Sequence, residues 1–175
     1  LMKYLVKFIV VTFFVLICTY SQAEQKAVYI DMKYVLNNCK AGKAAQDYLA
    51  KTFKDNQKKF ASTEKKLKEQ ESNLLSKKND LSKEDYKKDA DSLRKKVMEY
   101  QTSRRAAVEN IAKQRTDARN QLLSKINPIL ESYSKESDIS LIIDKKNLVM
   151  GNTDLDITKP IIEKLNKVLP SIKLN

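Results

Sequence analysis

Residues 76–85 read SKKNDLSKED and lie in the middle of a long stretch that contains no glycine or proline. That stretch extends from Lys43 to Asn127 and is dominated by Lys, Glu, Ala, Gln, Leu and Arg, which are good helix formers. We therefore expect it to be helical. The fold then depends on whether the chain passes through SKKNDLSKED as one rod or turns back there as two arms.

The spacing of apolar residues on the two sides of this segment favours the turn. Apolar residues recur there every seven residues, or in alternating steps of three and four, as is typical of a coiled coil. Folding the chain at residue 80 places the two runs opposite each other, in the pairs Leu74–Tyr86, Leu67–Leu93, Phe60–Tyr100, Phe53–Ala107 and Leu49–Ile111. The polar interruptions also match, because Asn56 falls opposite Arg104. Apolar and polar positions that pair symmetrically about a turn-like centre predict an antiparallel hairpin.

The local sequence of the tip supports a connection between two helices. The Asn-Asp pair at 79–80 tolerates the backbone of a tight turn. Ser82 followed by Asp85 resembles a capping box that begins the second helix, with Asp in place of the usual Glu. We expect the first helix to span about residues 43–78, and the second to kink or end near Pro128.

Two regions outside the arm are expected to form strands. AVYIDM (27–32) is short and contains β-branched residues. SLIID (140–144) is followed, after two lysines, by NLVMG (147–151), which suggests a β-hairpin. The sheet would therefore have about three strands.

Short helices are expected beside these strands. KYVLNNCKAG (33–42) is predicted to form a helix that ends at Gly42 and holds Cys39 as a half-buried residue. DITKP (156–160) is predicted to open the last helix, with Pro160 in its first turn.

The first segment has the composition of a secretory signal peptide. Two lysines precede the apolar stretch FIVVTFFVLIC (8–18), and small residues stand where a cleavage site ending at Ala23 requires them. We expect a signal peptide at 1–23 and export of the chain. A retained membrane anchor is the alternative, although the apolar stretch is shorter than the span of about 20 residues that a membrane helix needs. A lipoprotein cysteine in this stretch is disfavoured by the large residue before it.

The expected organisation is a mainly helical α+β chain. An antiparallel coiled-coil arm at 43–127, with its tip near 79–82, would project from a β-rich body formed by 24–42 and 128–175. A body this small, with an exposed sheet edge, makes a poor independent core. We therefore expect it to oligomerise through its strand residues Val28, Ile30, Leu141, Ile143, Leu148 and Met150.

Positive charge is concentrated on the predicted arm. Without residues 1–23, the chain carries 32 Lys and Arg against 22 Asp and Glu. Residues 43–127 alone hold 22 basic and 13 acidic side chains. An exported protein rarely meets nucleic acid, so we expect no nucleic-acid partner. The polyanions available to it are lipid headgroups, lipopolysaccharide and acidic proteins.

The composition argues against an enzyme. The chain has no histidine, which removes histidine-dependent triads and the commonest metal ligand. With only two glycines, Gly42 and Gly151, it cannot form a glycine-rich phosphate loop, so ATP use through such a loop is not expected. An enzyme that uses only carboxylates is conceivable, but no paired constellation indicates one. We expect no catalytic residue, no metal and no cofactor.

The chain resembles the Skp/OmpH-like periplasmic chaperones of Gram-negative bacteria. The likeness covers nearly all of the chain after residue 23, and it is most specific in DISLIIDKKNLVMG (138–151) and DITKPIIEKLNKV (156–168). It implies a periplasmic homotrimer with a barrel-like body and three helical arms around a central cavity. It also implies an ATP-independent holdase that keeps unfolded outer-membrane β-barrel proteins in that cavity and prevents their aggregation.

The resemblance also indicates where polyanions or clients would bind. Some members of the family carry a lipopolysaccharide-binding patch on the arm, built from basic residues and a glutamine. The basic residues in the corresponding region of this chain are Lys95, Lys96, Arg104, Arg105, Arg115 and Arg119.

Two other functions remain open from the sequence. A structural, envelope-tethering coiled coil would need a retained anchor or a peptidoglycan-binding segment, and the mass of the mature N-terminus would reveal whether the anchor is retained. A dedicated binder of lipopolysaccharide or anionic membranes predicts binding that is lost as salt is added, whereas client holding should keep an apolar component.

Overall fold

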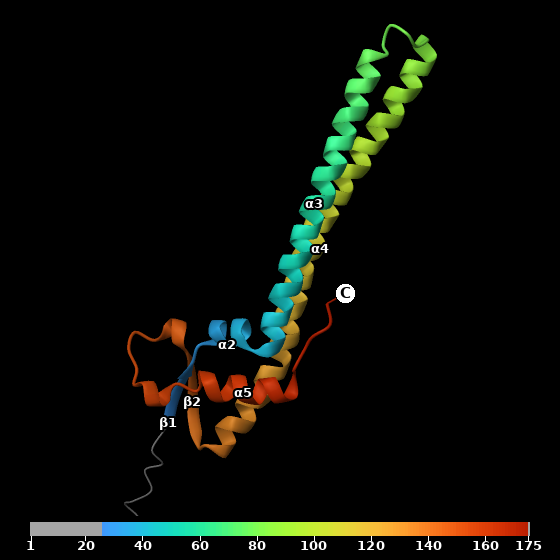
Figure 1. Ribbon diagram of the computed structural model, residues 1–175. Helices are drawn as coiled ribbons and strands as arrows, with labels where there is room; N and C mark the ends of the chain where they lie inside the picture. The colour runs from blue at the N-terminus through green and yellow to red at the C-terminus, as the bar shows by residue number, and fades with distance from the viewer. Residues whose placement is uncertain (1–25, 175) are drawn as a thin grey trace, which may run out of the picture.

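A computed structural model describes residues 26–174, and it shows a long two-helix arm that projects from a small body (Figure 1). The predicted signal peptide at 1–23 lies outside the described residues. The elements follow in the order β1 (Lys26–Ile30), α2 (Met32–Asn38), α3 (Lys40–Ser76), α4 (Lys83–Glu136), β2 (Ile139–Asp144), the short 3-10 turns η1 (Lys145–Asn147) and η2 (Thr153–Leu155), and α5 (Thr158–Val168). Within residues 26–174, no helix combines the length and the apolar character that a membrane span requires.

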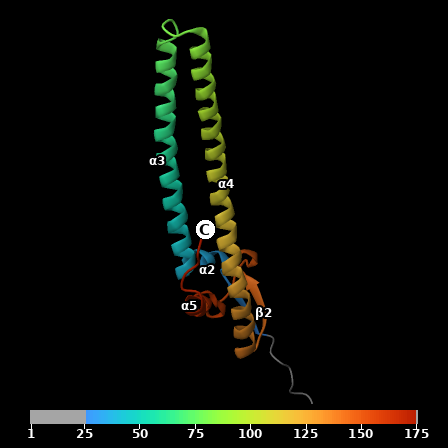
Figure 2. The same cartoon turned by 90° about the vertical axis from the view of Figure 1, so that its right-hand side faces the viewer.

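The arm is an antiparallel hairpin of α3 and α4, which lie side by side along its length (Figure 2). The 37 residues of α3 correspond to about 55 Å of helix. Residues at steps of three and four on both helices are half-buried in the seam, and most residues between them are exposed. The rings of Phe60 and Tyr100 meet edge to face in this seam, with centroids 5.9 Å apart, so one of the predicted cross-seam pairs is confirmed. The predicted helical hairpin on a small β-sheet body is also confirmed.

The tip is a short connection between Ser76 and Lys83. The Ser82 hydroxyl caps α4, because it accepts a hydrogen bond from the Asp85 backbone N–H at 3.1 Å. The same hydroxyl donates to the Asp85 carboxylate at 2.7 Å. The predicted cap at Ser82 is therefore confirmed. In a standard capping box, the Glu side chain accepts a hydrogen bond from the backbone N–H of the cap residue. Here the Asp85 carboxylate instead accepts a hydrogen bond from the Ser82 hydroxyl.

Pro128 does not end α4, since the helix continues to Glu136, so of the two predicted effects of this proline the end of the helix is ruled out. Proline removes one backbone hydrogen bond from a helix and is therefore costly in its interior. The residues Leu122, Ile126 and Ile129 on both sides of it are buried in the body core. Tertiary packing of this helix face therefore outweighs the local preference of the proline.

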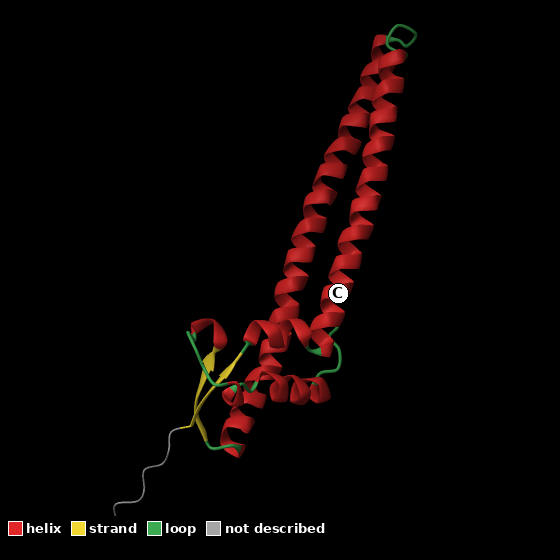
Figure 3. Cartoon of the chain, turned by 60° about the vertical axis from the view of Figure 1, so that its left-hand side comes forward, coloured by secondary structure: helices red, strands yellow, loops and turns green. Residues whose placement is uncertain are grey.

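The sheet consists of β1 and β2, which lie beside each other in the body (Figure 3). They pair in parallel, with Tyr29 opposite Ile143. Within residues 26–174 it has two strands, so the prediction of about three strands is wrong. The parallel arrangement follows from the connection, because the whole arm forms the crossover from one strand to the other.

The predicted hairpin between 140–144 and 147–151 is also wrong. After β2 the Asp144 carboxylate accepts a hydrogen bond from the Lys146 backbone N–H at 3.2 Å, and the chain coils into η1. This local side-chain cap competes with strand pairing and turns the chain out of the sheet. The chain then returns to the other side of β1, where Tyr29 makes an isolated parallel bridge.

The core of the body lies between α2, α4 and α5. Its most deeply buried side chains are Val35, Cys39, Ile126, Ile161 and Leu165. These residues come from segments far apart in the sequence, so the core closes only when the returning α4 and the last helix reach α2.

Cys39 separates α2 from α3, so the predicted single helix over 33–42 is wrong. The Cys39 backbone is extended, and its sulfur caps α3 by accepting a hydrogen bond from the Gly42 N–H at 3.2 Å. Cys39 is fully buried, not half-buried. Gly42 lies in the first turn of α3 and does not end the preceding helix.

Candidate functional site

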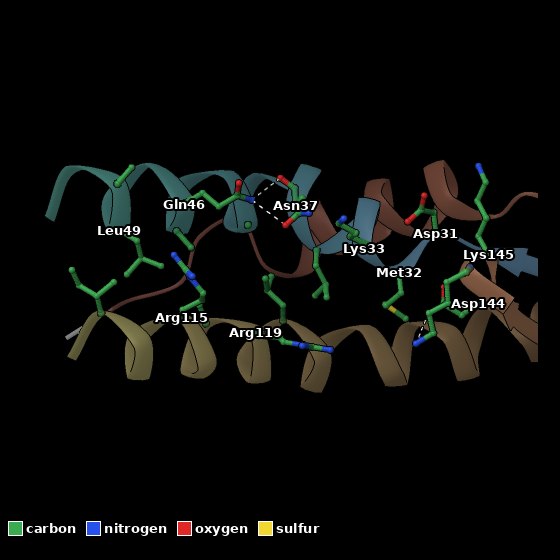
Figure 4. Close-up of a pocket in the computed structure, with 18 of the residues that line it drawn as sticks. Asp31, Met32, Lys33, Asn37, Gln46, Leu49, Arg115, Arg119, Asp144 and Lys145 are labelled. Atoms are coloured by element: carbon green, nitrogen blue, oxygen red, sulfur yellow. Dashed lines mark hydrogen bonds and ion pairs between the residues drawn. The ribbon is translucent and has the colours of Figure 1, made fainter. Parts of the chain in front are cut away.

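A groove of about 1110 Å³ lies at the foot of the arm, between α2, the first turns of α3 and the middle of α4 (Figure 4). We call it the arm-base groove. Its apolar lining consists of Met32, Leu36, Leu49, Phe53, Ile111 and Leu122. It therefore offers an open apolar floor beside the body, where a flexible chain segment can lie.

The rim of the arm-base groove is charged. Its ionisable side chains are Asp31, Lys33, Arg115, Arg119, Asp144, Lys145 and Lys146. Five of these seven side chains are cationic, so the groove favours a negatively charged ligand.

Both acidic residues of this rim already have partners in the chain. Asp31 caps α2, since its carboxylate accepts from the Tyr34 backbone N–H at 2.8 Å. Asp144 pairs with Lys146 at 3.5 Å, in addition to its contact with the backbone of η1. Lys145 is also engaged, at 4.0 Å from the Asp156 carboxylate.

The other three cations of the rim have no ion pair in the described part of the chain. They are Lys33 on α2 and the arginines Arg115 and Arg119, which stand one turn apart on α4. In Figure 4 the Arg115 side chain points across the groove toward α3. These three groups are free to hold an anion.

A second groove, of about 380 Å³, continues up the arm, and we call it the mid-arm groove. Phe53 and Ile111 line both grooves, so the two form one uninterrupted face. Phe53 is 50% exposed and Val108 in the second groove is 60% exposed. We call this continuous surface the arm face. It presents apolar side chains that the hairpin itself does not cover.

The edge of the mid-arm groove is polar. Glu64 is bound by Lys68 at 2.8 Å and accepts a hydrogen bond from the Tyr100 hydroxyl at 3.4 Å. The hydrogen bond and the charge of Lys68 lower the pKa of Glu64, with smaller contributions from Tyr100 and Arg104. Glu64 is therefore ionised at neutral pH, and Arg104 stands near a carboxylate without forming an ion pair with it.

The six basic residues predicted as polyanion or client contacts are distributed over several parts of the arm. Arg115 and Arg119 line the arm-base groove, and Arg104 lines the mid-arm groove. Lys96 donates a hydrogen bond to Gln70 on α3 at 3.1 Å. The remaining two, Lys95 and Arg105, are exposed and line neither groove.

Sequence reasoning missed three cations of the arm-base groove, Lys33, Lys145 and Lys146. They come from α2 and from the turn after β2, which are separated by the whole arm in the sequence. No spacing rule groups such residues, because the fold alone brings them to one rim.

The comparison with known families identifies the chain. Residues 26–165 match the family model of "Outer membrane protein (OmpH-like)". The chain belongs to the OmpH-like outer membrane protein family. The predicted family resemblance is therefore confirmed.

A solved structure shares the OmpH-like fold. The crystal structure of a candidate OmpH-like outer membrane chaperone from Caulobacter crescentus CB15 superposes with a TM-score of 0.80. The match covers 90% of this chain and 93% of that chain at 15% identity, so it establishes a common fold. No curated protein matches the sequence.

The body of this OmpH-like chain places the predicted interface residues in three environments. Val28 and Ile30 are buried in the core of the same chain. Ile143 and Leu148 are half-buried. Leu141 and Met150 are exposed, at 54% and 87%, beside Val149, which is completely exposed.

Within residues 26–174, the acidic and cysteine side chains form no group of three or more that could hold a metal ion.

Proposed function

We propose that this OmpH-like protein is an ATP-independent periplasmic holdase that binds unfolded outer-membrane β-barrel proteins and prevents their aggregation. The observation that carries the proposal is the arm face, where the exposed Phe53 and Val108 and the half-buried Ile111 lie in two adjoining grooves that Arg104, Arg115 and Arg119 also line. Membership in the OmpH-like family, and a fold shared with a solved candidate OmpH-like outer membrane chaperone, support it.

The arm face suits weak and exchangeable binding. Half-exposed side chains such as Phe53 and Val108 can cover apolar segments of an unfolded client without enclosing them. The basic arm attracts acidic segments over roughly a Debye length, which is about 10 Å at 0.1 M salt. Binding of this kind needs neither ATP nor a catalytic residue.

We also propose that three copies assemble through their bodies, so that their arms enclose a cavity for the client. The exposed apolar residues Leu141, Val149 and Met150 on and after β2 support an interface at this end of the molecule. The strand edge of β2 that does not face β1 is available to a neighbouring copy.

The test is an aggregation assay. A urea-unfolded outer-membrane β-barrel protein is diluted into buffer without ATP, with or without purified protein of residues 24–175, and light scattering is followed. We expect scattering to be suppressed near a fixed ratio of oligomer to client. Unchanged scattering, with a chaperone shown to be folded and oligomeric, would refute the holdase.

Paired variants test the role of the arm face. The double change Arg115→Gln and Arg119→Gln removes two cations from the arm-base groove, whereas Lys88→Gln and Lys113→Gln removes two exposed cations that line neither groove. We expect the first pair to weaken suppression and the second to leave it nearly unchanged. Equal effects would mean that net charge, and not this face, holds the client.

A salt titration separates the holdase from its main alternative. A dedicated binder of lipopolysaccharide or anionic membranes depends on charge, and we expect its binding to be lost as salt is added. The holdase should retain suppression through its apolar contacts. The same titration with lipopolysaccharide in place of the client shows whether that molecule is an additional ligand.

A further inference from the structure

We propose that the arm-base groove captures the C-terminal carboxylate of an unfolded client whose last residues are apolar. The inference rests on the proposed holdase function and identifies which part of the client this groove takes.

The rim of the arm-base groove carries cationic side chains that have no acidic partner within the described residues. The carboxylates of Asp31 and Asp144 are engaged by a helix cap and by Lys146, respectively. Arg115 and Arg119 form no ion pair within the described residues. A guanidinium binds a carboxylate through two parallel hydrogen bonds, which makes arginine well suited to this group.

The apolar floor lies directly beside these arginines. Ile111, which is half-buried, precedes Arg115 by one helical turn, and the half-exposed Phe53 lines the same groove from α3. Leu49 and Leu122 also line the groove but are almost fully buried, so Ile111 and Phe53 offer the accessible apolar surface. A ligand that places a carboxylate on the arginines can therefore rest an apolar group on the floor.

The end of a polypeptide meets both requirements with a single residue. Its last Cα atom carries a carboxylate and a side chain together, so an apolar last residue brings an anion and an apolar group to the groove at once. An internal Asp or Glu supplies the anion alone, and the chain must leave it in two directions.

The position of the groove gives the bound client a direction. The arm-base groove lies next to the body, and the mid-arm groove continues from it through Phe53 and Ile111. A client anchored by its terminus at the foot of the arm would therefore extend along the arm face toward the tip.

The test measures binding of short labelled peptides to the full protein by fluorescence anisotropy. One peptide ends in two leucines with a free carboxylate. A second has the same sequence with an amidated end, and a third is amidated and carries its only acid as an internal Glu. Laurate is included as an anionic amphiphile that is not a peptide.

We expect the free-acid peptide to bind at least about tenfold more tightly than both amidated peptides. Arg115→Gln with Arg119→Gln should abolish that preference. Arg115→Lys with Arg119→Lys should keep part of it, because the charge remains while the bidentate geometry is lost. Lys88→Gln with Lys113→Gln serves as the matched control, and circular dichroism verifies that every variant is folded.

Three results would overturn the inference. Equal binding of the acid and the amide would show that the groove recognises apolar groups alone. Equal binding of the internal-Glu peptide would show that it recognises any acidic segment. Binding of laurate without binding of the free-acid peptide would assign the groove to lipids. In each case aggregation assays on the same preparations report separately whether the holdase function stands.

Discussion

At the scale of single residues, position 42 leaves no room for a side chain. A Cβ atom on Gly42 would lie 2.0 Å from the backbone carbonyl oxygen of Leu36 and 3.0 Å from the Cys39 sulfur. The obstacle is the end of α2, which is fixed by the fully buried Val35 and Cys39. The sharp junction between α2 and α3 therefore requires a residue without a Cβ.

We predict that Gly42→Ala destabilises the body by about 2–4 kcal/mol, even though alanine is the better helix former. The cost arises because the Leu36 carbonyl must move, which disturbs the core around Val35. Urea denaturation followed by circular dichroism measures the change.

Gly151→Ala provides the matched control. Its nearest obstacle is the Leu148 Cδ2 atom at 2.7 Å, which is the end of a flexible side chain on the surface loop. We expect a clearly smaller loss of stability. Equal losses at the two positions would contradict the steric explanation.

At the scale of elements, an ion pair joins the end of α4 to α5. The Lys164 ammonium lies 2.8 Å from the Glu136 carboxylate, which also accepts a hydrogen bond from the Ser132 hydroxyl at 2.7 Å. The hydrogen bond from Lys164 lowers the pKa of Glu136 most, followed by that from Ser132 and the charge of Lys164. The pair helps to hold the last helix against the foot of the arm.

We predict that Glu136→Gln lowers the melting temperature at pH 7 by a few degrees at most, since the pair is exposed. A carboxylate whose pKa is lowered by folding stabilises the fold above its ordinary pKa of 4.5. That stability is lost as the pH falls through the lowered pKa of the folded state. The difference between wild type and variant should therefore shrink below about pH 4.5.

Melting curves of both proteins between pH 7 and pH 3 provide the measurement. Glu131→Gln, an exposed glutamate on the same helix that forms no ion pair in the described structure, is the control for the loss of one charge. A difference that stays constant or grows as the pH falls would contradict the assignment to this pair.

At the scale of the whole molecule, the chain is a long helical arm on a small body. The described body has a two-stranded sheet and leaves Leu141 on β2 and Val149 and Met150 after it exposed. A two-stranded sheet is marginal by itself, and a neighbouring copy would cover these side chains. Such an assembly would also hold several arms in fixed relation to one another.

We predict that the protein has a mass of more than one chain in solution, and that Leu141→Lys with Met150→Lys shifts it toward the monomer. Lysine at an apolar interface leaves a buried charge without a partner, which opposes association. Light scattering coupled to size exclusion measures the mass at several concentrations.

Met98→Lys, at a position on the arm that is 68% exposed, is the control for an added charge at an apolar site. It should leave the mass unchanged. An unchanged mass in the Leu141 and Met150 double variant would place the interface elsewhere, and a monomeric wild-type protein would contradict the proposed assembly.

The sequence by itself determined the features that depend on neighbours along the chain. The mirrored apolar spacing predicts the hairpin, because helical periodicity sets which side chains face one another, and the Phe60–Tyr100 contact follows from it. The Ser82 cap at the tip is equally local. The concentration of basic residues on the arm was also readable from the sequence.

Only the tertiary structure decided what depends on segments that are far apart. It pairs β1 with β2 in parallel, carries α4 past Pro128 and places Cys39 between two helices. It also divides the six predicted basic residues between two grooves and the open surface, and adds cations from the body to one rim. The physical reason is that core packing and groove formation sum many contacts across the fold, and these outweigh the preference of any single residue.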